Sequence, residues 1–367
     1  MSLLLGAGEL STRGTEARGP LAALAASLEA DLAPLVERKP VVPREKALLS
    51  RDGGRCPRHG ALLEFDPYSP DQHRCPRCGE TYSGERHYLW WVMGYQLWLA
   101  ERAVHAAALH ALLGRPALAT LAAHILDRYS ELYLTYPNRD NVLGPTRPFF
   151  SAYLESIWLL QLCVALDLLE SRGEARSLGQ SVRDRILEPS AALIASFDEG
   201  ASNRQVWNNA AVLAANLLLG RRGDAERAVS GPSGLFSHLR EALLSDGTWY
   251  EGENYHLFAH RGLWYGVTMA ERAGWTVPPP LARRFDEAFA TPFATALPDF
   301  TFPSRRDSQY RVSLRQWRFA ESCELGLARC HDARLVAALA ELYGGDAPEG
   351  DTGRWRSTAE AERNEPA

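Results

Sequence analysis

Most of the chain beyond residue 86 consists of apolar segments of helix length, many of which end at a glycine or a proline. The first spans residues 87–113, has apolar side chains at helical spacing and stops at Gly114, and the second stops at Pro137. Similar segments continue to about residue 343, and strand-like alternation is nearly absent among them. This pattern predicts about ten helices joined by short loops, which is typical of an all-α fold.

Two arrangements can bury the apolar faces of so many helices: an open solenoid or a closed toroid of helical hairpins. A solenoid would show a repeat of fixed length and similar sequence. Segment and loop lengths vary here, and polar, aromatic-rich loops interrupt the series. We therefore predict an incomplete (α/α) toroid of helical hairpins, which surround a cleft that loop residues line.

The composition changes along the chain and predicts four segments. Residues 1–50 hold a helix and a linker, and residues 51–86 are rich in Gly, Pro, Cys and His. Residues 87–343 form the toroid, and residues 344–367 form a polar tail or linker. Residues 1–9 are expected to be a disordered start, because they lack the basic region and the cleavage site of a secretory signal.

The charge balance argues against several kinds of partner. A formal net charge of −5 over 367 residues leaves no basic excess for binding nucleic acid through its phosphates. The only lysines are Lys39 and Lys46, so contacts with anions would mostly come from arginine. No apolar run reaches the ~18–20 residues of a membrane span. We predict no nucleic-acid or membrane partner and, since the six cysteines do not form a disulfide pattern, a cytoplasmic location.

A cysteine and histidine motif near the amino end predicts a small zinc-ribbon-like insertion. Its four candidate ligands are Cys56, His59, Cys75 and Cys78. Three thiolates and one imidazole can close a tetrahedral Zn²⁺ shell, which leaves no open position for catalysis. Gly60 and Gly79 follow the two ligand pairs and permit a tight turn there. We predict a structural Zn²⁺ and no organic cofactor; His73 competes with His59, and a metal-free loop is the alternative.

Two polar, aromatic segments lie where one apolar helix gives way to another: residues 202–209 and residues 246–256. In the first, Ser202 or Asn203 is expected to cap a helix whose free amides attract an anion. In the second, a turn leads to Tyr255 and two histidines beside two glutamates, which is a plausible acid/base site. The alternative for each residue is an ordinary role in capping or packing.

The stretches SNRQVWNNAAVLAANLLLG and DGTWYEGENYHLFAHRGL resemble two signature segments of the heparinase II/III-like polysaccharide lyases, a group that includes alginate lyases. The similarity extends from about the cysteine segment to about residue 330. It implies a helical toroid that cleaves a uronate-containing glycan by β-elimination. Asn203 falls on the asparagine that holds the uronate carboxylate, and Tyr255 falls on the catalytic tyrosine. Arg204 departs from the family, because relatives often have histidine there.

These residue types suit the chemistry. Neutralising the carboxylate next to C5 stabilises the enolate-like intermediate, and an acid/base group then moves the proton. The candidate catalytic residues are Tyr255, Asn203, Arg204 and His256. The candidate substrate-binding residues are Trp207, Trp249, Tyr250, Glu251, Glu253, His260 and Arg261, with Trp264 as a further aromatic. Weaker candidates, each of which could equally form a loop salt bridge, are Arg147, Glu155, Arg305, Arg306 and Asp307.

The expected partner is an acidic polysaccharide or oligosaccharide. Lyases of this family normally continue into a β-sandwich domain that completes the cleft, whereas no strand-rich region precedes Ala367. A β-sandwich domain or a partner chain could therefore complete the cleft. Two alternative functions remain: a non-catalytic glycan-binding toroid, and a toroid glycoside hydrolase that pairs Asp246 with Glu251 or Glu253.

Overall fold

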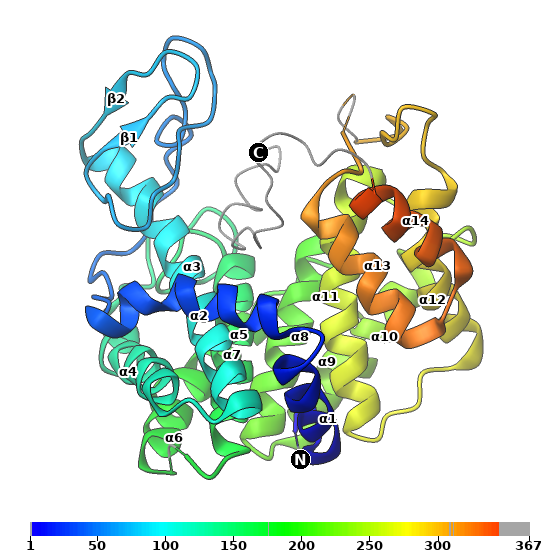
Figure 1. Cartoon of the computed structure of the whole chain (residues 1–367), viewed down its shortest axis with the longest axis horizontal. Helices are drawn as coiled ribbons and strands as arrows, with labels where there is room; N and C mark the ends of the chain where they lie inside the picture. Colours follow the sequence, from blue (N-terminus) through cyan, green and yellow to red (C-terminus); the bar gives the residue numbers. More distant parts are fainter. Residues whose placement is uncertain (1, 175, 308–309, 311, 345–367) are drawn as a thin grey trace. The chain divides into compact units, whose positions relative to one another are not determined.

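The computed structural model describes residues 2–174, 176–307, 310 and 312–344, and their regular secondary structure is almost entirely helical (Figure 1). They divide into two compact units. Unit 1 contains residues up to 197 together with 214–222, and unit 2 contains residues 198–213 and those from 223 onward. The predicted tail lies outside the described residues except for Gly344. The bounds of the four segments, 1–50, 51–86, 87–343 and 344–367, remain predictions from the sequence.

Unit 1 is built around α3, which packs against both α4 and α5 (Figure 1). Its elements are α1 (Ala7–Arg18), α2 (Ala22–Glu37), β1 (His73–Arg74), β2 (Thr81–Tyr82), α3 (Glu85–Leu113), α4 (Pro116–Leu132), α5 (Ala152–Glu170), α6 (Arg176–Val182) and α7 (Glu188–Ala195). A 3₁₀ turn, Tyr133–Thr135, follows α4, and a π-helical turn, Arg183–Leu187, joins α6 to α7. The two short strands pair antiparallel beyond the amino end of α3.

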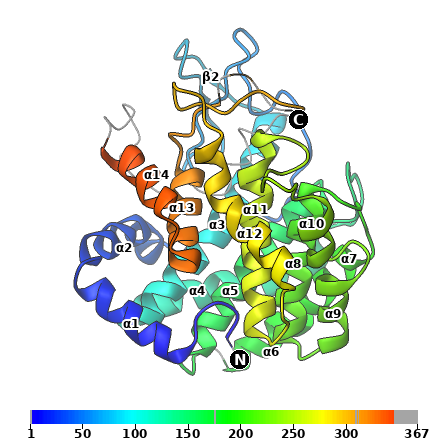
Figure 2. The ribbon, with the colours of Figure 1, turned by 90° about the vertical axis from the view of Figure 1, so that its right-hand side faces the viewer.

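Unit 2 begins at Asp198, just before α8, and the last residues of α8, 214–218, belong to unit 1. Its helices are α8 (Asn203–Leu218), α9 (Arg222–Ser230), α10 (Leu235–Glu241), α11 (Glu253–Arg272), α12 (Pro279–Ala294), α13 (Trp317–Cys330) and α14 (Ala333–Gly344). α13 and α14 pack against each other and both contact α12, while α11 lies against α12 and α13 (Figure 2). Consecutive antiparallel helices of this kind are the hairpins that the sequence predicts.

Local sequence signals explain where the main helices end. α3 stops at Gly114, whose φ of +70° and N–H···O bond of 2.8 Å to His110 form a left-handed cap.

α5 is rich in apolar residues. Among the described residues it is the helix that is long and apolar enough to cross a membrane, whereas the sequence predicted no such segment. Within that helix, 89% of the apolar window is buried in the protein, as in a core helix.

The amino-terminal residues differ from the predicted disordered start. α1 begins at Ala7, and the preceding Leu3 is buried. The Asp167 carboxylate in α5 accepts hydrogen bonds from the Leu3 N–H and the Ser2 hydroxyl, both at 2.9 Å. The prediction was wrong because a partner distant in the sequence binds these residues, and no local pattern reveals it.

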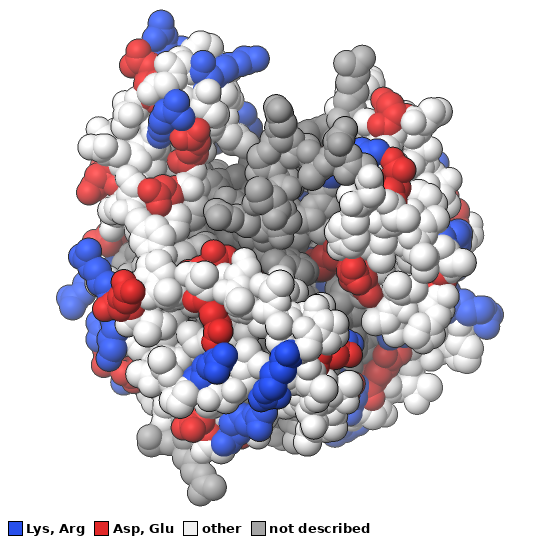
Figure 3. All heavy atoms as spheres, in the orientation of Figure 1, with Lys and Arg blue, Asp and Glu red and all other residues white. Residues whose placement is uncertain are grey.

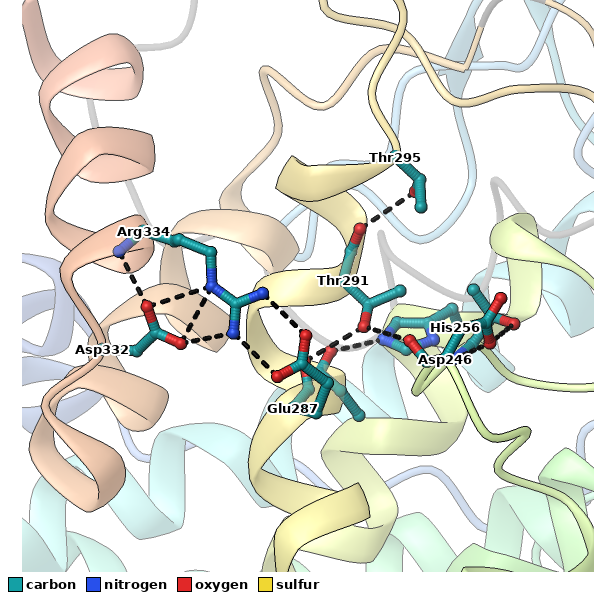
Figure 4. A network of polar contacts seen from close by, with 9 residues as sticks. Asp246, His256, Glu287, Thr291, Thr295, Asp332 and Arg334 are labelled. Carbon is teal, nitrogen blue, oxygen red and sulfur yellow. Dashed lines mark hydrogen bonds and ion pairs between the residues drawn. The ribbon is translucent and has the colours of Figure 1, made fainter.

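A proline inside α12 supplies an anchor for α11. Pro292 has no N–H, so the Ala288 carbonyl four residues earlier loses its helical hydrogen bond. The buried His256 of α11 donates to that carbonyl through Nε2 at 2.8 Å, while its Nδ1 accepts the Trp249 N–H at 3.2 Å. Figure 4 shows this contact beside Thr291, which donates to the Asp246 carbonyl. α12 therefore holds both ends of the loop that precedes α11.

The same helix is tied to α14 by charge. Arg334 donates both guanidinium ends to the Glu287 carboxylate, at 2.6 and 2.8 Å, and also contacts Asp332 (Figure 4). Hydrogen bonding to Arg334 lowers the pKa of Asp332, which keeps that carboxylate ionised. α12 is thus fixed from both sides, and it provides a rigid support for the loops of unit 2.

A buried lysine fixes the loop between α4 and α5 in unit 1. The Lys46 ammonium donates to the carbonyl oxygens of Pro137, Arg139 and Thr146 and to the side-chain oxygen of Asn141, at 2.6–3.1 Å. Four acceptors around one ammonium satisfy both the buried charge and the loop carbonyls.

Replacing Lys46 with methionine should lower the free energy of unfolding by about 2–4 kcal/mol, because four acceptors lose their donor. Urea denaturation followed by circular dichroism measures the change. Lys39→Met is the matched control, since Lys39 is exposed and is the other lysine of the chain. Equal destabilisation by the two substitutions would contradict the assigned role of Lys46.

Protonation of His256 should weaken the fold in acid. Burial lowers the pKa of folded His256 to about 4, against about 6.5 for a histidine in the unfolded chain. The stabilising contribution of neutral His256 is therefore complete above pH 6.5 and is lost as the pH falls to about 4, a change of about 3 kcal/mol. Unfolding free energies measured across this range should fall less steeply in His256→Gln. Parallel curves for the two proteins would contradict the prediction.

Candidate functional site

Three loops of unit 2 meet at one place: the loop before α8, the loop before α11, and the connection between α12 and α13. Glu251 joins all three. Its carboxylate accepts hydrogen bonds from Asn203 at the start of α8, and its carbonyl accepts the Asp307 N–H at 3.2 Å. These loops carry most of the predicted site residues.

The amino end of α8 holds an internal carboxylate. Ser202 is the cap, since its hydroxyl accepts the Gln205 N–H at 3.0 Å. The Asn203 N–H and side-chain amide both donate to Glu251 Oε2, at 3.2 and 2.9 Å. The Trp249 indole N–H donates to the same oxygen at 2.7 Å. The positive helix end and three donors therefore stabilise a negative charge that the protein itself supplies.

This arrangement separates the roles of two neighbouring residues. Asn203 is only 3% exposed, and its amide donates to an internal carboxylate, which is a positioning contact; its predicted contact with substrate stays a prediction. The Arg204 side chain is 39% exposed and donates through Nε to Glu199 at 2.7 Å. Tyr250 is half-buried, and its hydroxyl donates to the Ala201 carbonyl at 2.5 Å. Arg204 is thus the accessible charged group at this helix end.

The loop before α11 starts with a tight turn. Asp246 Oδ1 accepts the Thr248 N–H at 3.0 Å and the Thr248 hydroxyl at 2.6 Å. Partial burial opposes ionisation, but these hydrogen bonds hold the pKa of Asp246 below its ordinary value. Gly247 has a φ of +79°, and a Cβ there would lie 2.6 Å from the Thr291 hydroxyl. Only glycine fits at this position without displacing α12.

Tyr255 lies in the first turn of α11 and is half-buried. Its hydroxyl donates to Asp307 Oδ2 at 3.1 Å. Nearby, the Arg305 guanidinium forms an ion pair with the buried Glu253 carboxylate at 2.5 Å, and Arg306 donates to the backbone of the same loop. Of the three weaker candidates in the α12–α13 connection, Asp307 therefore contacts Tyr255 directly, while Arg305 and Arg306 contact other residues of the loop and of the first turn of α11. The phenol itself is partly accessible.

Four other candidates are buried in the core of unit 2. His256 and His260 are each 1% exposed, and Trp207 and Trp249 are equally inaccessible. His260 contacts the Phe285 carbonyl through Nε2 at 3.1 Å and stacks on His256. Burial lowers the pKa of both histidines well below the usual value, so both are neutral. All four side chains pack inside unit 2, and their predicted parts in acid/base chemistry and sugar stacking stay predictions.

Arg261 is also engaged within the protein. Its Nε lies 2.7 Å from the Glu321 carboxylate, and its guanidinium lies 5.2 Å from the Trp317 ring centre and 5.9 Å from that of Trp207. Trp264, one of the predicted sugar platforms, is half-buried. This arrangement orients α11 against α13 and leaves Arg261 a packing role.

The two weaker candidates in unit 1 form a separate structural network. Glu155 is fully buried and accepts hydrogen bonds from the hydroxyls of Tyr133, Ser190 and Thr146, at 2.6–2.7 Å, and from the Arg147 N–H at 2.8 Å. The Arg147 guanidinium lies over the Tyr133 ring. Four donors satisfy this carboxylate completely, so its role is to organise the loop before α5.

The predicted metal ligands do converge in unit 1. The side-chain atoms of Cys56, His59, Cys75 and Cys78 all lie within 4.8 Å of one another and could hold a metal ion. His73, the alternative fourth ligand, instead packs edge-on against Trp90 with a centroid distance of 5.2 Å.

Each ligand pair sits in the same backbone turn. The Gly60 N–H donates to the Cys56 carbonyl at 2.8 Å, and the Gly79 N–H donates to the Cys75 carbonyl at 2.9 Å. Both glycines have positive φ, +63° and +74°. Burial opposes ionisation of Cys56, but hydrogen bonds from Tyr82, His59 and the backbone lower the pKa of its thiol to about 6. A thiolate is the form that binds metals.

The cysteine segment packs on the first turns of α3. The Trp91 indole donates to the Asp66 carbonyl at 2.8 Å. A Cβ on Gly54 would lie only 2.3 Å from the Trp90 ring. The cluster of aromatic residues at the start of α3 is thus explained by the small segment that it supports.

Sequence reasoning missed Glu199, which pairs with Arg204. The sequence signal for this pair is weak. Glu199 lies a few positions before Arg204, on the other side of the helix start, in a stretch whose composition is typical of a turn. Figure 3 shows basic and acidic side chains interspersed on the visible face of the molecule.

No family model matches this sequence, and no curated protein matches it either. The solved structures that this chain matches include two alginate lyases. An alginate lyase from Bacteroides ovatus is 14% identical, with 95% of this chain and 96% of that chain covered and a TM-score of 0.62. Alginate lyase A1-III from Sphingomonas species A1 is 14% identical, with 84% and 88% covered and a TM-score of 0.47. The first likeness confirms the predicted all-α toroid class, and the chain has an alginate lyase-like polysaccharide lyase fold.

Proposed function

We propose that this protein is a polysaccharide lyase that cleaves a uronic-acid-containing glycan by β-elimination. The observation that carries the proposal is the Tyr255 hydroxyl, a half-buried acid/base group beside exposed arginines, in a chain with an alginate lyase-like fold. The fold likeness makes alginate the first substrate to try.

An accessible arginine at the end of α8, which Asn203 joins to the loop before Tyr255 through Glu251, supports the first requirement of the reaction. Removal of the C5 proton leaves negative charge that spreads into the adjacent carboxylate, so a cation must neutralise that carboxylate. Arg204 is the best candidate, because its guanidinium is partly exposed at the positive end of α8. Asn203 contributes indirectly, by holding Glu251 and with it the loop that carries Tyr255.

Tyr255 is our candidate for both proton transfers. Its oxygen accepts the C5 proton, and its O–H then donates to the leaving O4 as the C4–O4 bond breaks. His256 cannot exchange protons with a sugar from its buried position, so we assign it the task of holding the Trp249 backbone. One accessible phenol with arginine close by fits elimination better than it fits hydrolysis.

The carboxylates do not support the alternative of a glycoside hydrolase. That reaction needs one carboxyl group that stays protonated as the acid. The pKa of Asp246 is lowered, mainly by its hydrogen bonds with Thr248 acting against partial burial. Glu253 is buried in an ion pair with Arg305. The assay that tests the lyase also tests the alternative of a non-catalytic glycan-binding protein.

Alginate and other acidic polysaccharides incubated with the purified protein should develop ultraviolet absorbance, because elimination creates a conjugated C4–C5 double bond. Tyr255→Phe should lower the initial rate by roughly 10²–10⁴-fold, the usual contribution of a general acid/base. The matched control is Tyr343→Phe, an exposed tyrosine of α14 that should keep the parent rate.

New reducing ends that appear without ultraviolet absorbance would indicate a hydrolase and contradict the proposed lyase. Glycan binding without any turnover, unchanged in Tyr255→Phe, would instead identify a binding module.

We further propose that the cysteine cluster binds Zn²⁺ as a structural ion. Tetrahedral zinc with bonds of ~2.3 Å to sulfur and ~2.0 Å to nitrogen needs ligand atoms roughly 3.5–3.8 Å apart. Cys56 Sγ lies 3.9 Å from Cys78 Sγ and 3.4 Å from His59 Nδ1, which supports this ion. A closed shell of four protein ligands would stabilise residues 51–86, which have only a small core of their own.

The purified protein should contain about one zinc per chain by mass spectrometry of the metal. Cys75→Ser should lose that zinc and make residues 51–86 more sensitive to limited proteolysis. Cys330→Ser, at a half-buried thiol in α13, is the control and should keep the metal. Metal content that is unchanged in Cys75→Ser would rule out this site.

A further inference from the structure

The contact between Tyr255 and Asp307 fixes the direction of the phenol hydrogen. The hydroxyl donates to Asp307 Oδ2 at 3.1 Å, and an ionised carboxylate can only accept. With its hydrogen directed at Asp307, the Tyr255 oxygen presents its lone pairs to its other neighbours. That is the orientation a base needs when it approaches a C–H bond.

Asp307 is held in place by its backbone as well as by its side chain. Its N–H donates to the Glu251 carbonyl at 3.2 Å. The preceding residue, Arg306, has a φ of +55°, a left-handed conformation that non-glycine residues seldom adopt. The Arg306 guanidinium donates to the Tyr250 carbonyl, so side-chain and backbone contacts hold this strained turn against the loop.

The charged groups around the pair are already matched. Arg305 pairs with Glu253 at the start of α11, and Arg306 contacts the loop backbone. The Glu251 carboxylate turns toward Asn203 and the α8 terminus. Behind the loop, His256 is neutral because burial lowers its pKa to about 4. The Asp307 carboxylate contacts the phenol oxygen directly and is a group that can take up a proton.

We infer that Asp307 is the positioning residue and proton acceptor of Tyr255. This role rests on the proposed elimination. As the C5–H bond breaks, the Tyr255 oxygen takes that proton while its own hydroxyl proton passes to Asp307, so the phenol remains neutral. The C5–H electron pair forms the C4–C5 double bond, and the C4–O4 pair leaves on O4. Tyr255 then protonates O4, and Asp307 returns its proton to Tyr255.

The relay avoids the need to form a free phenolate before the reaction. Carboxylates are adequate bases for protons next to a carbonyl group, as aspartate and glutamate bases in isomerases demonstrate. Neutralisation of the uronate by Arg204 brings the C5 proton into that class. Asp307 therefore supplies the basicity, and Tyr255 carries the proton between substrate and carboxylate.

Asp307→Asn preserves the shape of the side chain but cannot hold the proton. It should lower kcat by roughly 10²-fold or more with KM nearly unchanged. Its rate should also lose the acid limb of the pH profile and recover toward alkaline pH, where phenolate forms in bulk water. Asp307→Glu should restore part of the rate. Asp299→Asn, an exposed aspartate of the same α12–α13 connection, should behave as the parent.

A second measurement tests the contact without any turnover. Ultraviolet difference titration of the parent against Tyr255→Phe isolates the ionisation of this phenol. The same difference taken in the Asp307→Asn background should shift to lower pH, because a neighbouring carboxylate opposes formation of phenolate. Identical titrations in the two backgrounds, or an Asp307→Asn enzyme with the parent's kcat and pH profile, would overturn the inference. An inactive parent that shows the shift would contradict only the proposed function.

Discussion

A single carboxylate at the amino end of α8 organises the candidate site. Glu251 Oε2 receives three N–H groups, two from Asn203 and one from the Trp249 indole, and the Glu251 carbonyl receives a fourth from Asp307. One residue thus connects a helix terminus, the loop that carries Tyr255 and the connection that carries Asp307. Such charge-assisted hydrogen bonds are stronger than neutral ones. These hydrogen bonds give the exposed loops a defined geometry that the short loop sequences alone do not provide.

Local patterns in the sequence predict the fold better than they predict the roles of its side chains. Helical spacing and glycine stops are local, so the series from α3 onward is predictable, as are the Ser202 cap and the clustering of the cysteines. Apolar spacing does not reveal α9, because the residues of this helix are mostly polar. It also does not reveal the burial of His256, because its partner carbonyl is released by a proline on another helix. Contacts between distant residues decide whether a histidine is a catalyst or a packed core residue.

The two units use charge differently. In unit 1, the buried Glu155 and Lys46 each meet four partners and stabilise the loop before α5. In unit 2, Glu253 is buried as well, but its partner Arg305 keeps 50% of its side chain exposed, and Arg204 keeps 39%. A buried charge whose hydrogen bonds are all made favours a rigid loop, whereas a partly exposed arginine can exchange its partner for a ligand.

The burial of Lys46 has a practical consequence for labelling. Of the two ε-amines in the chain, Lys39 is exposed, while Lys46 is enclosed by the carbonyl oxygens of the loop that follows α4. A reagent specific for lysine side chains should therefore modify the folded protein at Lys39 alone, and surfaces coupled through this amine would present every molecule in one orientation. The slower modification of Lys46, followed by mass spectrometry, would then report the rate at which that loop opens.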